Sequence, residues 1–179
     1  MLIVTYTVLM LADGALTYFN TPDLSMEGNP LVANFGLGWG ALVIANAVVF
    51  ALLFWAAYYG FFRYQPRFNE ETKFTRYVSQ LLFDRPDRFW TGLIPKHFAP
   101  VAAMFGVTML YAGIVARVVV VAEWLAISFG WNWTLWWKIR ANFIDRVDLA
   151  LALVTWVIAA IGWFYKQYRF NQKQQTGTA

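Results

Sequence analysis

The chain has 179 residues, of which 60% are hydrophobic, 20% are aromatic and only 13% are charged. Soluble domains average nearer half apolar and a quarter charged, so this composition argues against a water-exposed globule. The sequence holds no Cys and a single His, which argues against disulfides, thiolate nucleophiles, Cys-based metal sites and bis-His haem. We therefore expect bound lipid and no haem or other redox cofactor.

Four apolar runs are long enough to cross a bilayer as helices. A hydrocarbon core of about 30 Å requires roughly 20 mostly apolar residues in a helix. Barrel strands would alternate apolar and polar residues over roughly ten positions, whereas these runs are continuously apolar. The sequence predicts an all-α polytopic membrane protein, a four-helix bundle in a single transmembrane domain over 1–179, with helices at about 2–18, 31–62, 98–129 and 143–165 and a cytoplasmic tail at 166–179.

The first run is short and is interrupted by Asp13. We expect it to be a retained helix and not a signal peptide, because no Lys or Arg precedes it and an acidic residue is atypical of a signal's apolar region. The small residues around Asp13, from Ala12 to Ala15, favour packing against protein at this point.

Basic residues are distributed unevenly among the connections. Ten Lys and Arg residues lie between Arg63 and Lys96 and in the tail, whereas only Lys138 and Arg140 lie in the connections on the opposite side. Under the positive-inside rule, this asymmetry predicts a cell-membrane protein with both termini in the cytoplasm. The same charges account for the basic composition, so we expect no nucleic-acid partner.

The long basic connection contains an amphipathic segment. Asn69 can cap a helix over about 70–83, whose first turn is acidic. Apolar residues then recur with helical spacing at Phe74, Tyr77, Val78, Leu81 and Leu82. This helix either lies on the cytoplasmic lipid surface or forms a docking surface for a partner subunit.

The connection between the third and fourth runs places four Trp within seven positions, 131–137. Trp prefers the boundary between membrane and water, so the segment predicts an outer aromatic belt. A ligand-binding aromatic cage is the alternative. His97, at the inner boundary, could ligate one pigment or haem, but we expect it to be structural.

Small residues indicate where helices approach one another closely. In lipid, helix association depends on close packing, which small side chains permit. The residues predicted to make such contacts are Gly36, Gly40, Ala102, Gly106 and Gly113.

Ionisable groups within membrane helices are costly, so they are the first place to look for function. The predicted intramembrane polar cluster comprises Asp13, Thr17, Asn46, Arg117, Glu123, Asp145, Arg146 and Asp148. Arg117 lies near mid-bilayer and shares no helix face with Glu123. We therefore expect its acidic partner on another helix, either Asp13 or Asp148.

Three functions remain open for this cluster. Interhelical ion pairs would indicate a non-enzymatic accessory or structural subunit of a membrane complex, or a homo-oligomer. Carboxylates left over in the outer half would suit a small cation- or proton-coupled transporter or channel. A metal-dependent membrane enzyme would use Asp13, Glu27 and Asp148 as ligands or as acid and base.

The first outer loop carries a short motif. Asn29 can cap the second helix with Pro30 at its first position, and Glu27 lies near the positive end of that helix. Asp13-x-x-x-Thr17 followed by Glu27-x-Asn29-Pro30 resembles a family of small uncharacterised prokaryotic integral membrane proteins over about the first 50 residues. The resemblance implies no activity, only that these five residues act as one unit.

Overall fold

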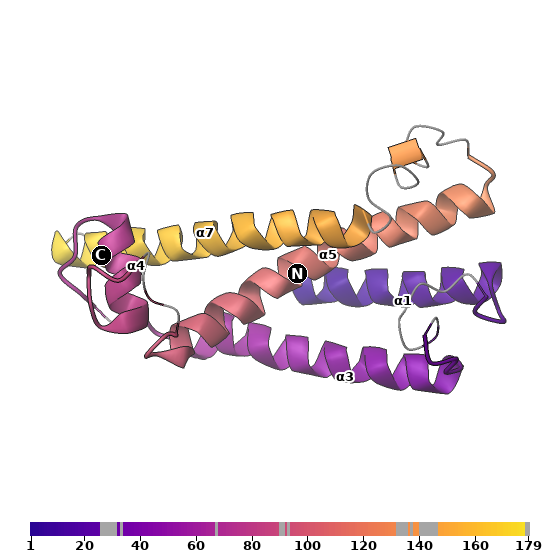
Figure 1. Ribbon diagram of the computed structural model, residues 1–179, viewed down its shortest axis with the longest axis horizontal. Helices are drawn as coiled ribbons and strands as arrows, with labels where there is room; N and C mark the ends of the chain where they lie inside the picture. The colour runs from indigo at the N-terminus through magenta and orange to yellow at the C-terminus, as the bar shows by residue number, and fades with distance from the viewer. Residues whose placement is uncertain are drawn as a thin grey trace. The chain divides into compact units, whose positions relative to one another are not determined.

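The computed structural model describes residues 1–25, 32, 34–66, 68–89, 92, 94–131, 136, 138–139 and 147–177. Its elements are α1 (Leu2–Asn20), α3 (Trp39–Tyr58), a π-helical turn η1 (Tyr59–Arg63), α4 (Phe74–Phe83), α5 (Phe98–Ser128) and α7 (Val147–Gln175), shown in Figure 1. No strand occurs in these described ranges. By length and composition, α1, α3 with η1, α5 and α7 can each cross a membrane. The protein is an all-α, multi-pass membrane protein, as its composition predicts.

The second membrane helix begins later than predicted. The expected start near residue 31 is wrong, because α3 begins at Trp39. Gly36 has φ +63, in the left-handed region that an α-helix cannot include. Residues 36–38 have no regular structure. The glycine-rich segment therefore separates α3 from the chain before it.

The last helix continues ten residues beyond the predicted end at 165, to Gln175. Side chains on these added turns bind the backbone of the segment before α4. Asn171 accepts the N–H of Asn69 at 3.0 Å and donates to the Asn69 carbonyl at 2.8 Å, and Gln172 donates to the Glu71 carbonyl at 3.0 Å. Much of the predicted tail is thus helical, and it binds the segment that precedes α4.

α4 starts at Phe74, later than the predicted residue 70. Asn69 does not cap it, because α7 holds the Asn69 backbone and the Asn69 Oδ1 accepts the N–H of Glu71 at 3.1 Å. The helix ends at Phe83 as predicted, and Asp84 follows it in the left-handed conformation with φ 58.

The apolar face of α4 is covered by protein. Tyr77, Val78 and Leu81 are buried and pack against Phe164 and Tyr168 of α7. The interpretation that this face lies on lipid is therefore wrong. The amphipathic pattern is accounted for by packing within the chain.

Residue contacts divide the chain into two compact units, Met1–Leu53 with Leu110–Thr155, and Phe54–Met109 with Trp156–Ala179. In the first unit, Tyr6 of α1 stacks on Phe50 of α3 at 6.1 Å, and Tyr18 contacts Trp39 edge-on at 5.5 Å. These two pairs make α1 and α3 antiparallel, as consecutive membrane crossings require.

α1 and α5 run parallel within the same unit. Asn20 at the end of α1 donates to the hydroxyl of Ser128 at the end of α5 at 2.9 Å. Earlier along both helices, a Cβ added to Gly113 would lie 2.8 Å from the ring of Tyr6. Gly113 is therefore a close-packing position between α1 and α5.

In the second unit, glycines let α5 approach α3 and η1. A Cβ at Gly106 would overlap the carbonyl of Ala56, and one at Gly60 would lie 2.5 Å from the Ala103 oxygen. Ala102, by contrast, is exposed, and the buried small residue is its neighbour Ala103. Of the predicted packing residues on α5, Gly106 and Gly113 thus lie at close contacts and Ala102 does not.

Candidate functional site

Three polar side chains join α1, α3 and α5 in the first unit. Arg117 of α5 donates from Nη1 to Asp13 Oδ2 on α1, and from Nη2 to Asn46 Oδ1 on α3 at 2.7 Å. Asn46 also donates to the carbonyl of Leu42, one turn earlier, at 2.9 Å. We call this set the Asp13–Arg117–Asn46 network. It links three membrane-spanning helices through side chains that would be costly in lipid if left alone.

Burial gives the network its energetic weight. The side chains of Arg117 and Asp13 are 24% and 11% exposed. An Arg near the centre of a membrane helix costs roughly 3 kcal/mol on insertion scales. An adjacent carboxylate and hydrogen bonds to the charged groups offset much of that cost. Of the two acids expected to serve Arg117, the structure pairs it with Asp13.

A cavity of about 380 Å³ lies beside the network. Its polar wall consists of Asp13, Asn46, Arg117 and Thr17, which lies one turn after Asp13 and is buried. The rest of the lining is apolar or small: Met10, Leu11, Gly14, Ala15, Trp39, Leu42, Val43 and Ala47. The site is thus an apolar pocket with one polar wall, the usual form of a small-molecule or ion site.

Small residues near Asp13 border open space. Among the described residues, a Cβ added to Gly14 would meet no atom within 4 Å. The prediction that the patch around Asp13 packs against protein is therefore not met at Gly14, which lines the cavity. Gly36 and Gly40, predicted as packing residues, likewise have no atom of the described residues within 4 Å of an added Cβ.

The remaining members of the predicted cluster lie elsewhere. Glu123 accepts a hydrogen bond from the indole Nε1 of Trp136 at 2.8 Å, which ties the Trp-rich connection to α5. Asp148 lies in the first turn of α7, where the helix dipole favours a negative charge. Neither side chain lines the cavity of the network. Asp145 and Arg146 lie outside the described residues, as do Glu27, Asn29 and Pro30 of the outer-loop motif.

A second cluster, around Asp84, follows α4. Asp84 binds the ammonium of Lys96 at 2.7 Å and Nε2 of His97 at 2.9 Å. The hydrogen bond from Lys96, followed by the contact with His97, lowers the pKa of Asp84 to about 2. The backbone N–H groups of Lys96 and His97 also bond the Leu82 carbonyl, at 2.8 and 3.2 Å. His97 is thus part of a clamp on the end of α4, a role that periodicity alone does not reveal.

Metal ligation has limited support in the part of the chain that the structure describes. There, no group of three or more His, Asp or Glu side chains is close enough to hold an ion. Of the three residues proposed as ligands for an enzyme, Asp13 is paired with Arg117 and Glu27 is outside the described ranges.

Comparisons with protein-family models, curated proteins and solved structures give no match for this chain. The resemblance based on Asp13, Thr17, Glu27, Asn29 and Pro30 therefore stays a prediction.

Proposed function

We propose that this protein is a non-enzymatic membrane subunit that helps to assemble a membrane complex or a homo-oligomer. The observation that carries the proposal is the Asp13–Arg117–Asn46 network, whose polar groups bond one another across α1, α3 and α5. The excess of basic residues in 63–96 and the tail supports a cell-membrane location with both termini in the cytoplasm. The Trp-rich connection supports an outer aromatic belt.

The network has the properties of a structural link. A charge used for transport or catalysis must be available to a ligand, whereas Arg117 is engaged by a carboxylate and by an amide oxygen. A polar group buried in a membrane helix specifies which helices associate, because mismatched helices would leave it unsatisfied. These groups therefore suit assembly of a defined bundle.

The exposed surfaces of the first unit also favour a partner. Val43, Ile44, Val48 and Val49 of α3 are all more than half exposed. Gly40, near the start of the same helix, has open space where a side chain would lie. The missing side chain lets a partner helix approach closely at this position. Packing against lipid chains alone would not need such a small residue.

Purification in a mild detergent tests the proposal. We expect a defined oligomer, or stoichiometric partner proteins, by native mass spectrometry. The variant Asp13→Leu should dissociate this assembly, whereas the matched variant Glu123→Leu, outside the network, should leave it intact. A monodisperse wild-type monomer without partners would contradict the proposal.

The cavity beside the network favours a second candidate, a small cation- or proton-coupled transporter or channel. A space of about 380 Å³ touching a carboxylate, a hydroxyl and an amide is suited to an ion or a small polar solute. In proteoliposomes, this candidate predicts a pH- or cation-dependent flux that Asp13→Asn abolishes and Glu123→Gln preserves. Absence of flux from wild-type protein that still forms its oligomer would exclude it.

A further inference from the structure

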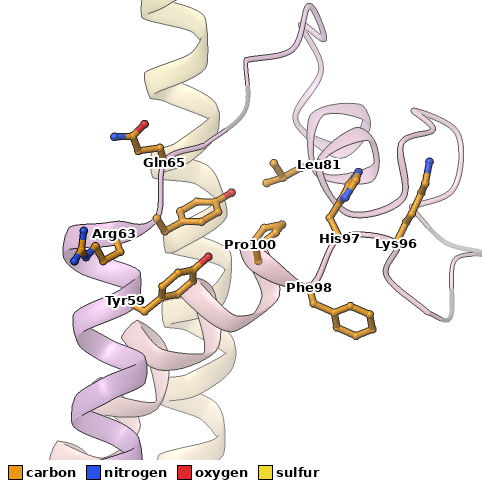
Figure 2. A pocket seen from close by; sticks show the side chains of 10 residues that line it. Tyr59, Arg63, Gln65, Leu81, Lys96, His97, Phe98 and Pro100 are labelled. Atoms are coloured by element: carbon orange, nitrogen blue, oxygen red, sulfur yellow. The ribbon is translucent and has the colours of Figure 1, made fainter.

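A second pocket, of about 240 Å³, lies in the other unit. It is formed where η1 ends and α5 begins, and Figure 2 shows its lining side chains. Arg63 lies on one side of the pocket, Lys96 and His97 lie on the other, and Pro100 lies between them. The cations thus flank the pocket and come from two separate segments of the chain.

The lining is basic and contains no acid. Among its ten residues are Arg63, Lys96, His97 and the phenols of Tyr59 and Tyr64, but no Asp or Glu. Asp84 binds Lys96 and His97 without lining the pocket, so it offsets one positive charge there. Within the described residues, no carboxylate lies within ion-pair distance of Arg63. The pocket therefore keeps a net positive charge at neutral pH.

The pocket lies at the ends of two membrane-spanning segments. Arg63 is the last residue of one candidate span and Phe98 is the first residue of the next. Basic and aromatic side chains at such ends lie at the level of the lipid headgroups. Phe98, Leu81 and Pro100 add apolar surface to the same pocket. An occupant would thus meet cations, phenol hydroxyls and apolar side chains together.

The π-helical turn shapes one wall of this pocket. The N–H of Tyr64 bonds the carbonyl of Tyr59 at 2.9 Å, five residues earlier. The turn carries Tyr59 and Arg63, which both line the pocket, and it includes Gly60, where η1 meets α5 closely. Single π-helical turns of this kind occur often at functional sites.

We propose that this pocket binds the phosphodiester headgroup of an anionic glycerophospholipid, with the phosphate attracted by Arg63 and Lys96. Basic pockets at the cytoplasmic ends of membrane helices recognise anionic headgroups. Zwitterionic lipids carry no net charge and are attracted less strongly by the basic side chains. The apolar lining and the level of the pocket at the span ends favour a lipid over a soluble phosphate. The pocket shares no residue with the Asp13–Arg117–Asn46 network and does not depend on the function proposed for that network.

The test uses the full-length protein, delipidated in detergent and supplied with equimolar phosphatidylglycerol and phosphatidylcholine. Native mass spectrometry then measures the lipid retained. We expect phosphatidylglycerol to be retained about tenfold or more over phosphatidylcholine, since each basic residue near an anionic headgroup contributes roughly a factor of five. The double variant Arg63→Gln/Lys96→Gln should reduce this preference to less than about twofold.

A matched control removes the same charge from the same unit. Arg76 and Arg85 are exposed and do not line the pocket, so Arg76→Gln/Arg85→Gln should keep the preference within about twofold of wild type. Arg63→Lys, which keeps the charge, should also retain it, and circular dichroism confirms that each variant is folded. Equal loss in the control, or no preference in the wild type, would overturn the proposal. Displacement of the lipid by millimolar inorganic phosphate would overturn the assignment to a lipid.

Discussion

Removing one member of the buried ion pair should cost far more than removing both. In Asp13→Leu, Arg117 keeps its charge but loses the carboxylate, and its side chain is only 24% exposed. Breaking a buried pair in this way costs about 3–5 kcal/mol, whereas replacing both charges by apolar side chains is often close to neutral.

The double variant has one remaining cost. Asp13→Leu/Arg117→Leu leaves Asn46 Oδ1 without the guanidinium that it bonds at 2.7 Å. A single interhelical hydrogen bond of this kind contributes about 0.6–2 kcal/mol in a membrane. We therefore expect each single variant to lose about 3 kcal/mol and the double variant about 1 kcal/mol, a coupling energy of roughly 5 kcal/mol.

The assay is the free energy of unfolding in mixed micelles, measured by titration with a denaturing detergent. Glu123→Leu combined with Arg117→Leu provides the control cycle, because Glu123 bonds Trp136 and not Arg117. The changes in the free energy of unfolding caused by Glu123→Leu and by Arg117→Leu should add to within about 0.5 kcal/mol in the double variant. A double variant that loses the sum of the two single effects would refute the structural role of the pair.

Three further predictions concern the second unit. Asn171→Ala removes both hydrogen bonds to Asn69 from a buried position, so it should cost about 2 kcal/mol in the same titration and open the segment before α4 to protease. The pKa of Asp84 in the folded protein is about 2, below the ordinary 3.8, so its contribution to stability is complete above about pH 4 and is lost as the pH falls towards 2. The free energy of unfolding measured against pH should show this loss in the wild type and not in Asp84→Asn. Gly106→Ala places a Cβ against the backbone of Ala56 and should lower the free energy of unfolding by about 1–3 kcal/mol in the same titration. The control Gly162→Ala, at an open helical position, should be neutral or slightly stabilising. Similar losses at both sites would contradict the packing argument.

The membrane-spanning architecture could be predicted because it depends on composition. Long apolar runs fix the number of spanning helices, and their interruptions fix the approximate ends. The predicted helix ends are wrong where a local backbone conformation or a contact with a distant part of the chain determines where the helix begins or ends. The start of α3 depends on Gly36 adopting a positive φ, which the sequence permits but does not require. The end of α7 depends on bonds from Asn171 to Asn69, about 100 positions away in the chain.

The Asp13–Arg117 pair could be narrowed down from the sequence but not identified. The cost of an unpaired Arg117 in a membrane helix predicts an acidic partner on another helix, and Asp13 and Asp148 are the two candidates. The choice between Asp13 and Asp148 depends on which helices are neighbours, and small residues were the only guide to that. Within the described chain, other groups fill the space beside Gly106 and Gly113, whereas Gly14 and Gly40 border open space.

These two outcomes for small residues have a common physical reason. A glycine in a membrane helix is compatible with close approach, but the sequence does not say whether the approaching group belongs to the same chain. Gly106 meets the backbone of Ala56, whereas Gly40 meets nothing in the described chain. A glycine beside open space on a lipid-facing helix lacks the van der Waals contacts that a neighbouring side chain would make. A second helix that packs there can supply these contacts. We therefore expect Gly40→Leu to shift the oligomer distribution of the proposed assembly and Gly162→Leu to leave it unchanged, as native mass spectrometry of the two variants would measure.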